Sequence, residues 1–78
     1  ENLLSLIIKA LEDNTNPLHT DSVFILGELK DRSSLPALRQ ALSQEDSDIV
    51  ANAAHVLGLF QDKEAVPYLI KVCNSYGL

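Results

Sequence analysis

The sequence predicts an all-α protein, an α-solenoid of stacked helical hairpins with five helices in about two and a half repeats. A shift of 31 residues brings the 78-residue chain into register with itself without a gap. Apolar residues recur at helical spacing, and no segment shows the strict alternation that is typical of a half-buried strand. A fixed period of this length indicates stacked units, none of which can bury its apolar face alone.

The internal repeat rests on identical residues at matching positions, and most other aligned pairs keep their chemical character. Because the register holds without a gap, a leucine-rich composition does not explain it. The identical pairs are Leu4 and Leu35, Ala10-Leu11 and Ala41-Leu42, Leu26-Gly27 and Leu57-Gly58, Asp31 and Asp62, Pro36 and Pro67, and Leu38 and Leu69.

The first expected helix covers residues 1–13 and forms half a repeat. Its apolar stripe at helical spacing consists of Leu4, Ile7, Ile8 and Leu11. The chain begins inside this pattern and without a methionine. We therefore expect residues 1–78 to form a single domain that is a piece of a longer array.

The first complete repeat is residues 17–44, in which we expect two helices, 17–30 and 33–44. Asn16 is a helix-capping residue, and Pro17 suits the first helical position because its missing N–H needs no partner there. Asp31 is expected to open the second helix by accepting hydrogen bonds from free N–H groups and by complementing the helix dipole.

The second complete repeat is residues 48–75, in which we expect two helices, 48–61 and 64–75. Ser47 or Asp48 is expected to cap the first of these helices, and Asp62 to open the second. Gly58, like Gly27 in the first repeat, lies near the end of the first helix. A glycine at this place either permits close helix approach or begins helix termination.

These residues resemble the pattern of the HEAT repeat superfamily, and specifically the short HEAT-like repeats of the phycobilisome-lyase type. The second copy supplies Ile49, Ala53, Ala54, Val56-Leu57-Gly58, Phe60, Asp62, Ala65-Val66-Pro67 and Leu69. The resemblance implies a right-handed solenoid whose second helices line the concave side. The arginine that the family often has after the first apolar position is His19 in one copy and Val50 in the other. We therefore expect no arginine–aspartate ladder between the repeats.

Charge and composition argue against several classes of function. The chain has 6 basic and 11 acidic residues and a net charge of −5, so a nucleic-acid backbone would be repelled. Its longest apolar run, Val23 to Leu26, is too short to cross a bilayer. The single cysteine, Cys73, rules out an internal disulfide framework and favours a reducing compartment, by default the cytoplasm.

The histidines and the cysteine do not form a catalytic pattern, and we expect no cofactor. His19 and His55 occupy different repeat positions, and neither is followed by the glutamate of the iron-binding His-Glu pairs in the related deoxyhypusine hydroxylases. Cys73 aligns with Leu11 and Leu42, so we expect a small core residue rather than a nucleophile. It becomes partly exposed where no following repeat covers it.

A calcium site is also not expected. Asp46-Ser47-Asp48 resembles the start of a calcium-binding loop, but Ala51 and Leu57 stand where that loop needs a glycine and a glutamate. Helix capping and dipole complementarity explain this acidic cluster, so the sequence predicts no metal ligands.

The outward positions of the second helices are the candidate binding site. Stacked repeats bring these positions side by side and combine an aliphatic group, an aromatic group and modest positive charge. Tyrosine is a favoured interface anchor because it buries area at low entropic cost. The candidate residues are Leu6, Lys9, Ala37, Gln40, Tyr68 and Lys71. We expect a non-catalytic scaffold or adaptor module that binds a protein or peptide partner through this face.

Two other functions stay open. The chain could be an accessory segment of an enzyme, such as a bilin lyase subunit or a metal-dependent modification enzyme, with the chemistry supplied elsewhere. It could also self-associate, because a truncated array exposes an apolar helix face at each end. These faces are Leu3, Leu4, Ile7 and Ile8 at one end and Val66, Ile70 and Cys73 at the other.

Overall fold

The structure, a computed structural model, describes residues 2–76 and is all-α, as expected. In this range five α-helices and two 3-10 turns follow one another along the chain, and there is no strand. The α-helices are α1 (Leu3–Glu12), α2 (His19–Leu29), α3 (Leu35–Ala41), α4 (Ser47–Leu59) and α5 (Val66–Tyr76), and the 3-10 turns are η1 (Arg32–Ser34) and η2 (Lys63–Ala65).

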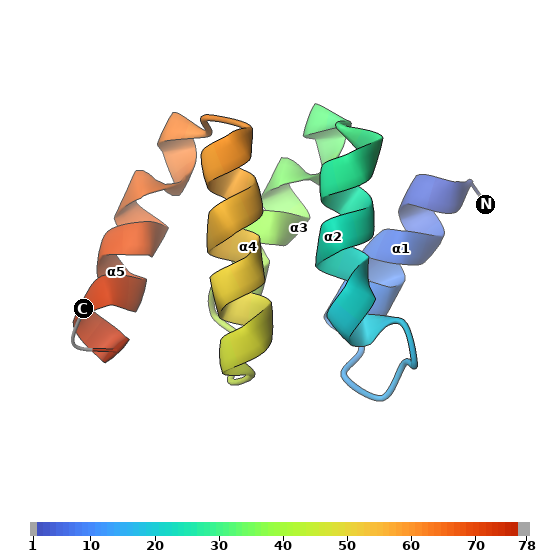
Figure 1. The fold of residues 1–78 in the computed structure, drawn as a ribbon, viewed down its shortest axis with the longest axis horizontal. Helices are drawn as coiled ribbons and strands as arrows, with labels where there is room; N and C mark the ends of the chain where they lie inside the picture. The colour runs from blue at the N-terminus through green and yellow to red at the C-terminus, as the bar shows by residue number, and fades with distance from the viewer. Residues whose placement is uncertain (1, 77–78) are drawn as a thin grey trace.

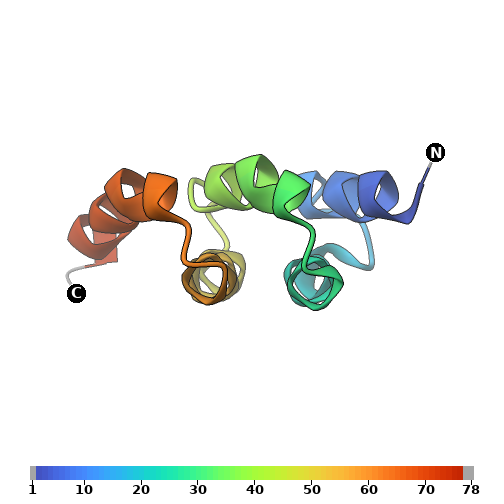
Figure 2. The same ribbon diagram turned by 90° about the horizontal axis from the view of Figure 1, so that it is seen from above.

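The helices form two layers (Figure 1, Figure 2). In one layer α2 and α4 lie side by side and run in the same direction, while α1, α3 and α5 form the other layer. α2 packs against α1 and α4, and α3 packs against α1 and α4. Each hairpin therefore rests on its neighbour, which is the arrangement expected of stacked repeats.

The core lies between the two layers, and α2 and α4 contribute equivalent residues to it. Leu26 and its equivalent Leu57 are 0% and 1% exposed. Ser22 and Ala53 are also equivalent, and both are fully buried. The Oγ of Ser22 donates a hydrogen bond of 2.6 Å to the carbonyl of His19. Serine therefore replaces alanine here without leaving its hydroxyl unpaired.

Burial decreases along the chain at α5. Leu35 on α3 is 5% exposed, whereas its equivalent Val66 on α5 is 48% exposed. Cys73, expected as a small core residue that becomes partly exposed where no following repeat covers it, is exposed, although its equivalents Leu11 and Leu42 are buried. The reason is that α2 covers α1 and α4 covers α3, but no helix among the described residues covers α5 in the same way.

The apolar end face expected on α1 is smaller than predicted. Ile7 is buried in the core, so it does not belong to an exposed face. Leu4 and Ile8 are half-buried and pack against the core, and of the four predicted residues Leu3 alone is exposed. The cause is that both α2 and α3 pack against α1.

The start of α4 differs from the prediction. Asp46 caps this helix, not Ser47 or Asp48. Its carboxylate accepts hydrogen bonds from the backbone N–H of Asp48 at 2.9 Å and of Ile49 at 3.4 Å. The capping oxygen thus satisfies donors that have no partner inside the helix.

The starts of α2, α3 and α5 are preceded by turns. Asn16 opens a turn ahead of α2, because its Oδ1 accepts from Leu18 N at 2.8 Å and its carbonyl accepts from His19 N at 2.9 Å. α3 and α5 begin later than expected because η1 and η2 precede them. Asp31, expected to open the second helix, opens η1 ahead of it, with its Oδ1 accepting from the N–H and the hydroxyl of Ser33 at 2.9 and 2.7 Å. The side chain of Asp62 makes no equivalent capping bond.

The two equivalent glycines have different environments. A Cβ at Gly27 would lie 3.2 Å from Cγ2 of Val56, so this glycine lets α2 and α4 approach closely. A Cβ at Gly58 would meet no other atom within 4 Å, apart from its own helix backbone and chain neighbours. Gly27 therefore permits close helix approach, and Gly58 does not serve that purpose. The left-handed residue that follows α4 is Gln61 rather than a glycine.

The first helix of each complete repeat is followed by a left-handed residue. Lys30 has a φ of 53° and its equivalent Gln61 a φ of 55°. A residue with a Cβ costs about 1 kcal/mol in this conformation, which glycine adopts freely. We expect Gln61→Gly to raise the free energy of unfolding by about 0.5–1 kcal/mol, measured by urea denaturation.

Gln40→Gly is the matched control, because Gln40 is exposed inside α3. The same substitution is expected there to lower the free energy of unfolding by about 1 kcal/mol, since glycine loses more backbone freedom in a helix. Effects of the same sign at the two positions would contradict the role of the left-handed backbone.

Candidate functional site

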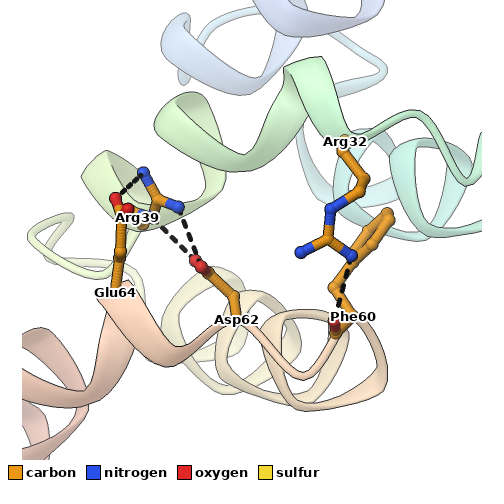
Figure 3. Close-up of polar contacts among 5 residues, drawn as sticks. All are labelled: Arg32, Arg39, Phe60, Asp62 and Glu64. Carbon is orange, nitrogen blue, oxygen red and sulfur yellow. Dashed lines mark hydrogen bonds and ion pairs between the residues drawn. The ribbon is translucent and has the colours of Figure 1, made fainter.

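A bidentate ion pair joins the two complete repeats (Figure 3). Arg39 on α3 donates from Nε to Oδ2 of Asp62 at 2.7 Å and from Nη2 to Oδ1 at 2.8 Å. Its Nη1 also lies 3.2 Å from Oε2 of Glu64. The planar guanidinium matches the geometry of a carboxylate. The pair therefore fixes α3 relative to the turn that precedes α5.

No arginine–aspartate ladder was expected between the repeats, but a single arginine–aspartate ion pair joins them. The arginine comes from the second helix of the repeat, not from the first helix where the family pattern places it. The hydrogen bonds from Arg39 hold the pKa of the Asp62 carboxyl below its ordinary value. Arg39 aligns with Ile8 and Ile70, which cannot form ion pairs. The Arg39–Asp62 contact therefore does not recur at the equivalent positions of α1 and α5.

All six residues of the predicted face lie in the layer of α1, α3 and α5. They are exposed, except for Ala37, which is half-buried and packs against the core. The structure brings two of the six, Tyr68 and Lys71, into one groove. The positions on each helix are Leu6 and Lys9 on α1, Ala37 and Gln40 on α3, and Tyr68 and Lys71 on α5.

This groove, which we call the α3–α5 groove, has a volume of about 440 Å³. Tyr68, Lys71 and Val72 line it from α5, while Leu42 and Gln44 line it from the end of α3 and the turn that follows. The Tyr68 side chain is 41% exposed and therefore has surface left for a partner. The groove offers an aromatic ring, apolar carbons, an amide and a positive charge to a peptide.

Two side chains close the C-terminal end of α1. Nδ1 of His19 lies 3.1 Å from the carbonyl oxygen of Ala10, and Nε2 of Gln44 donates to the carbonyl of Leu11 at 2.9 Å. The last carbonyls of a helix have no intrahelical partner, so these bonds stabilise the end of α1. Nε2 of His19 is buried without a hydrogen-bond partner in the described structure. His19 therefore packs within the fold, whereas His55 is exposed.

The described residues show no metal centre or membrane span. Within 2–76, no three His, Cys, Asp or Glu side chains lie close enough together to hold a metal ion. Asp46, the first residue of the segment that resembles a calcium loop, caps α4. None of the helices in the same range combines the length and the apolar character that crossing a bilayer requires.

Comparison with known proteins supports the repeat pattern. A family model described as HEAT repeats matches residues 4–76 and so covers both complete repeats. It represents the repeat family as a whole, so the likeness to the phycobilisome-lyase type stays a resemblance. No curated protein and no solved structure matches the chain.

Proposed function

Because the chain belongs to the HEAT repeat family, whose members commonly mediate protein interactions, we propose that it is a non-catalytic protein-interaction module. It binds a protein or peptide partner through the layer of α1, α3 and α5. The residues of this face are Leu6, Lys9, Ala37, Gln40, Tyr68 and Lys71.

The α3–α5 groove is the observation that carries the proposal. Tyrosine side chains at the centre of an interface often supply a large part of the binding free energy, because a rigid ring buries much surface. Tyr68 stands exposed beside the half-buried Val72, so a partner side chain can pack against both. Lys71 in the same groove favours a partner with an acidic group at that point.

Tyr68→Ala and Lys71→Glu test the face. We expect each variant to weaken the binding of a partner isolated with the parent chain by about tenfold, measured by calorimetric titration. Both side chains are exposed, so the melting temperature is expected to stay within about 2 °C of the parent value.

The matched controls are Leu29→Ala and Lys63→Glu, which change an exposed apolar side chain and an exposed lysine outside this face. A partner that binds Tyr68→Ala and Lys71→Glu as tightly as the parent would overturn the assignment of the face. Sedimentation of the free chain accompanies the titration, because the exposed Val66 and Ile70 on α5 also favour self-association through the ends. A strict monomer at high concentration would exclude that second function.

A further inference from the structure

The layer of α2 and α4 carries a second groove, which we call the α2–α4 groove. It has a volume of about 760 Å³ and lies between the two helices that face the viewer in Figure 1. Gly27 and Val56 both line it, and the missing side chain of Gly27 lets α2 and α4 pack closely there. Val56 is 3% exposed, so the exposed apolar surface of the groove comes from other side chains.

Two large apolar side chains in this groove are exposed. Phe24 on α2 is 51% exposed and Leu59 on α4 is 69% exposed, and both line the groove. The buried residues of the same helices, such as Leu26 and Leu57, belong to the core instead. Exposed apolar side chains gathered in a groove between parallel helices are typical of sites that bind an amphipathic helix.

The groove also has a charge that differs from that of the chain. Lys30 and Arg32, directly after α2, both line it, and Glu28 is the acidic residue among the lining side chains. The lining therefore has a net positive charge, whereas the whole chain has a net charge of −5. If the local charge of the groove selects the partner, rather than the net negative charge of the whole chain, the partner should carry acidic residues.

Arg32 is already held in place at this end of the groove (Figure 3). Its Nη1 donates to the carbonyl of Phe60 at 3.3 Å, and its guanidinium carbon lies 5.9 Å from the centroid of the Phe60 ring. A guanidinium that is held on an aromatic ring loses less freedom when it binds a carboxylate. The remaining guanidinium N–H groups are the donors that a carboxylate would use.

We propose that the α2–α4 groove binds an amphipathic helix of a partner protein, with acidic residues at the end beside Lys30 and Arg32. Apolar residues of this helix at i, i+3 or i+4, and i+7 contact Phe24 and Leu59. The site is separate from the face of α1, α3 and α5, so the module presents a different surface on each layer.

Selection from a random peptide library tests this site. Peptides of about 14 residues, roughly 20 Å long as helices, are displayed on phage and selected on the whole chain at 0.15 M salt, the ionic strength at which surface charges are screened beyond about 8 Å. We expect the selected peptides to combine apolar residues at helical spacing with an excess of Asp and Glu. An attraction governed by the net charge of the chain would select basic peptides instead.

A synthetic copy of a selected peptide is then titrated against variants. Leu59→Glu is expected to weaken binding about tenfold or more, and Lys30→Glu about fivefold. Replacing the acidic residue of the peptide by lysine should restore binding to Lys30→Glu. Leu29→Glu is the matched control, because Leu29 is an exposed leucine at the end of α2 that does not line the groove.

The outcomes are distinct. Tyr68→Ala is expected to leave peptide binding within about twofold, so failure of this proposal and failure of the proposed function are separable. The proposal is overturned if no peptide is enriched, if the enriched peptides are basic, or if Leu59→Glu binds them as the parent does. Circular dichroism checks that Leu59→Glu remains folded, as expected for a side chain that is 69% exposed.

Discussion

Leu38→Ala is expected to lower the free energy of unfolding by about 3 kcal/mol. Leu38 is 0% exposed on α3, and α3 packs against both α1 and α4. Truncation removes the transfer free energy of the lost carbons and leaves a cavity that closely packed neighbours cannot fill. A domain of this size has a total stability of roughly 4–12 kcal/mol, so the loss is a large fraction of it. Urea denaturation followed by circular dichroism measures the change.

Leu69→Ala is the matched control, because Leu69 occupies the equivalent position on α5 and is half-buried. We expect it to lower the free energy of unfolding by about 1 kcal/mol, since less apolar surface returns to water and little cavity forms. If the two substitutions had equal effects, α5 would be as well covered as α3, contrary to the structure.

Arg39→Leu is expected to lower the melting temperature by about 10 °C. The substitution leaves the Asp62 carboxylate, which is 4% exposed, without its counter-ion. A buried charge that loses its partner is more destabilising than the loss of the hydrogen bonds alone. Asp62→Asn breaks the same contact but removes the charge, so its melting temperature should fall by less than half as much. Equal losses in the two variants would contradict this explanation.

The ion pair also predicts a dependence on pH. Arg39 lowers the pKa of Asp62 in the folded state. The contribution of the ion pair to stability is therefore fully present above the ordinary pKa of 3.8. The contribution is lost as the pH falls through the lower pKa of the folded state. The difference in melting temperature between the parent chain and Asp62→Asn should therefore be constant near neutral pH and shrink below about pH 4. A difference that stayed as large at low pH as at neutral pH would argue against the ion pair.

The repeat and its helices could be predicted because apolar periodicity is a local property of the sequence. The capping residue of α4 could not, because Asp46, Ser47 and Asp48 are all capping types in a row and only the backbone path selects among them. The contact between Arg39 and Asp62 depends on the rotation of one repeat relative to the next. No pattern within a single repeat records that rotation.

Of the two candidate surfaces, one could be predicted from the sequence and the other could not. The exposure of Tyr68 and Lys71 could be predicted because the repeat alignment assigns their positions on the helix. The α2–α4 groove was missed because it is built from residues that are not equivalent: Phe24 aligns with His55, and Glu28 with Leu59. Neither shared identity nor a row of similar residues signals a surface of this kind.

The exposed position of α5 has a consequence for how the molecule responds when a partner binds in the α3–α5 groove. With Val66 and Ile70 uncovered, α5 is the helix that separates from the rest at the lowest cost in free energy. The α3–α5 groove spans this helix and the more firmly held turn after α3. We expect a partner that binds in this groove to hold α5 against the turn after α3 and so to reduce fraying of α5.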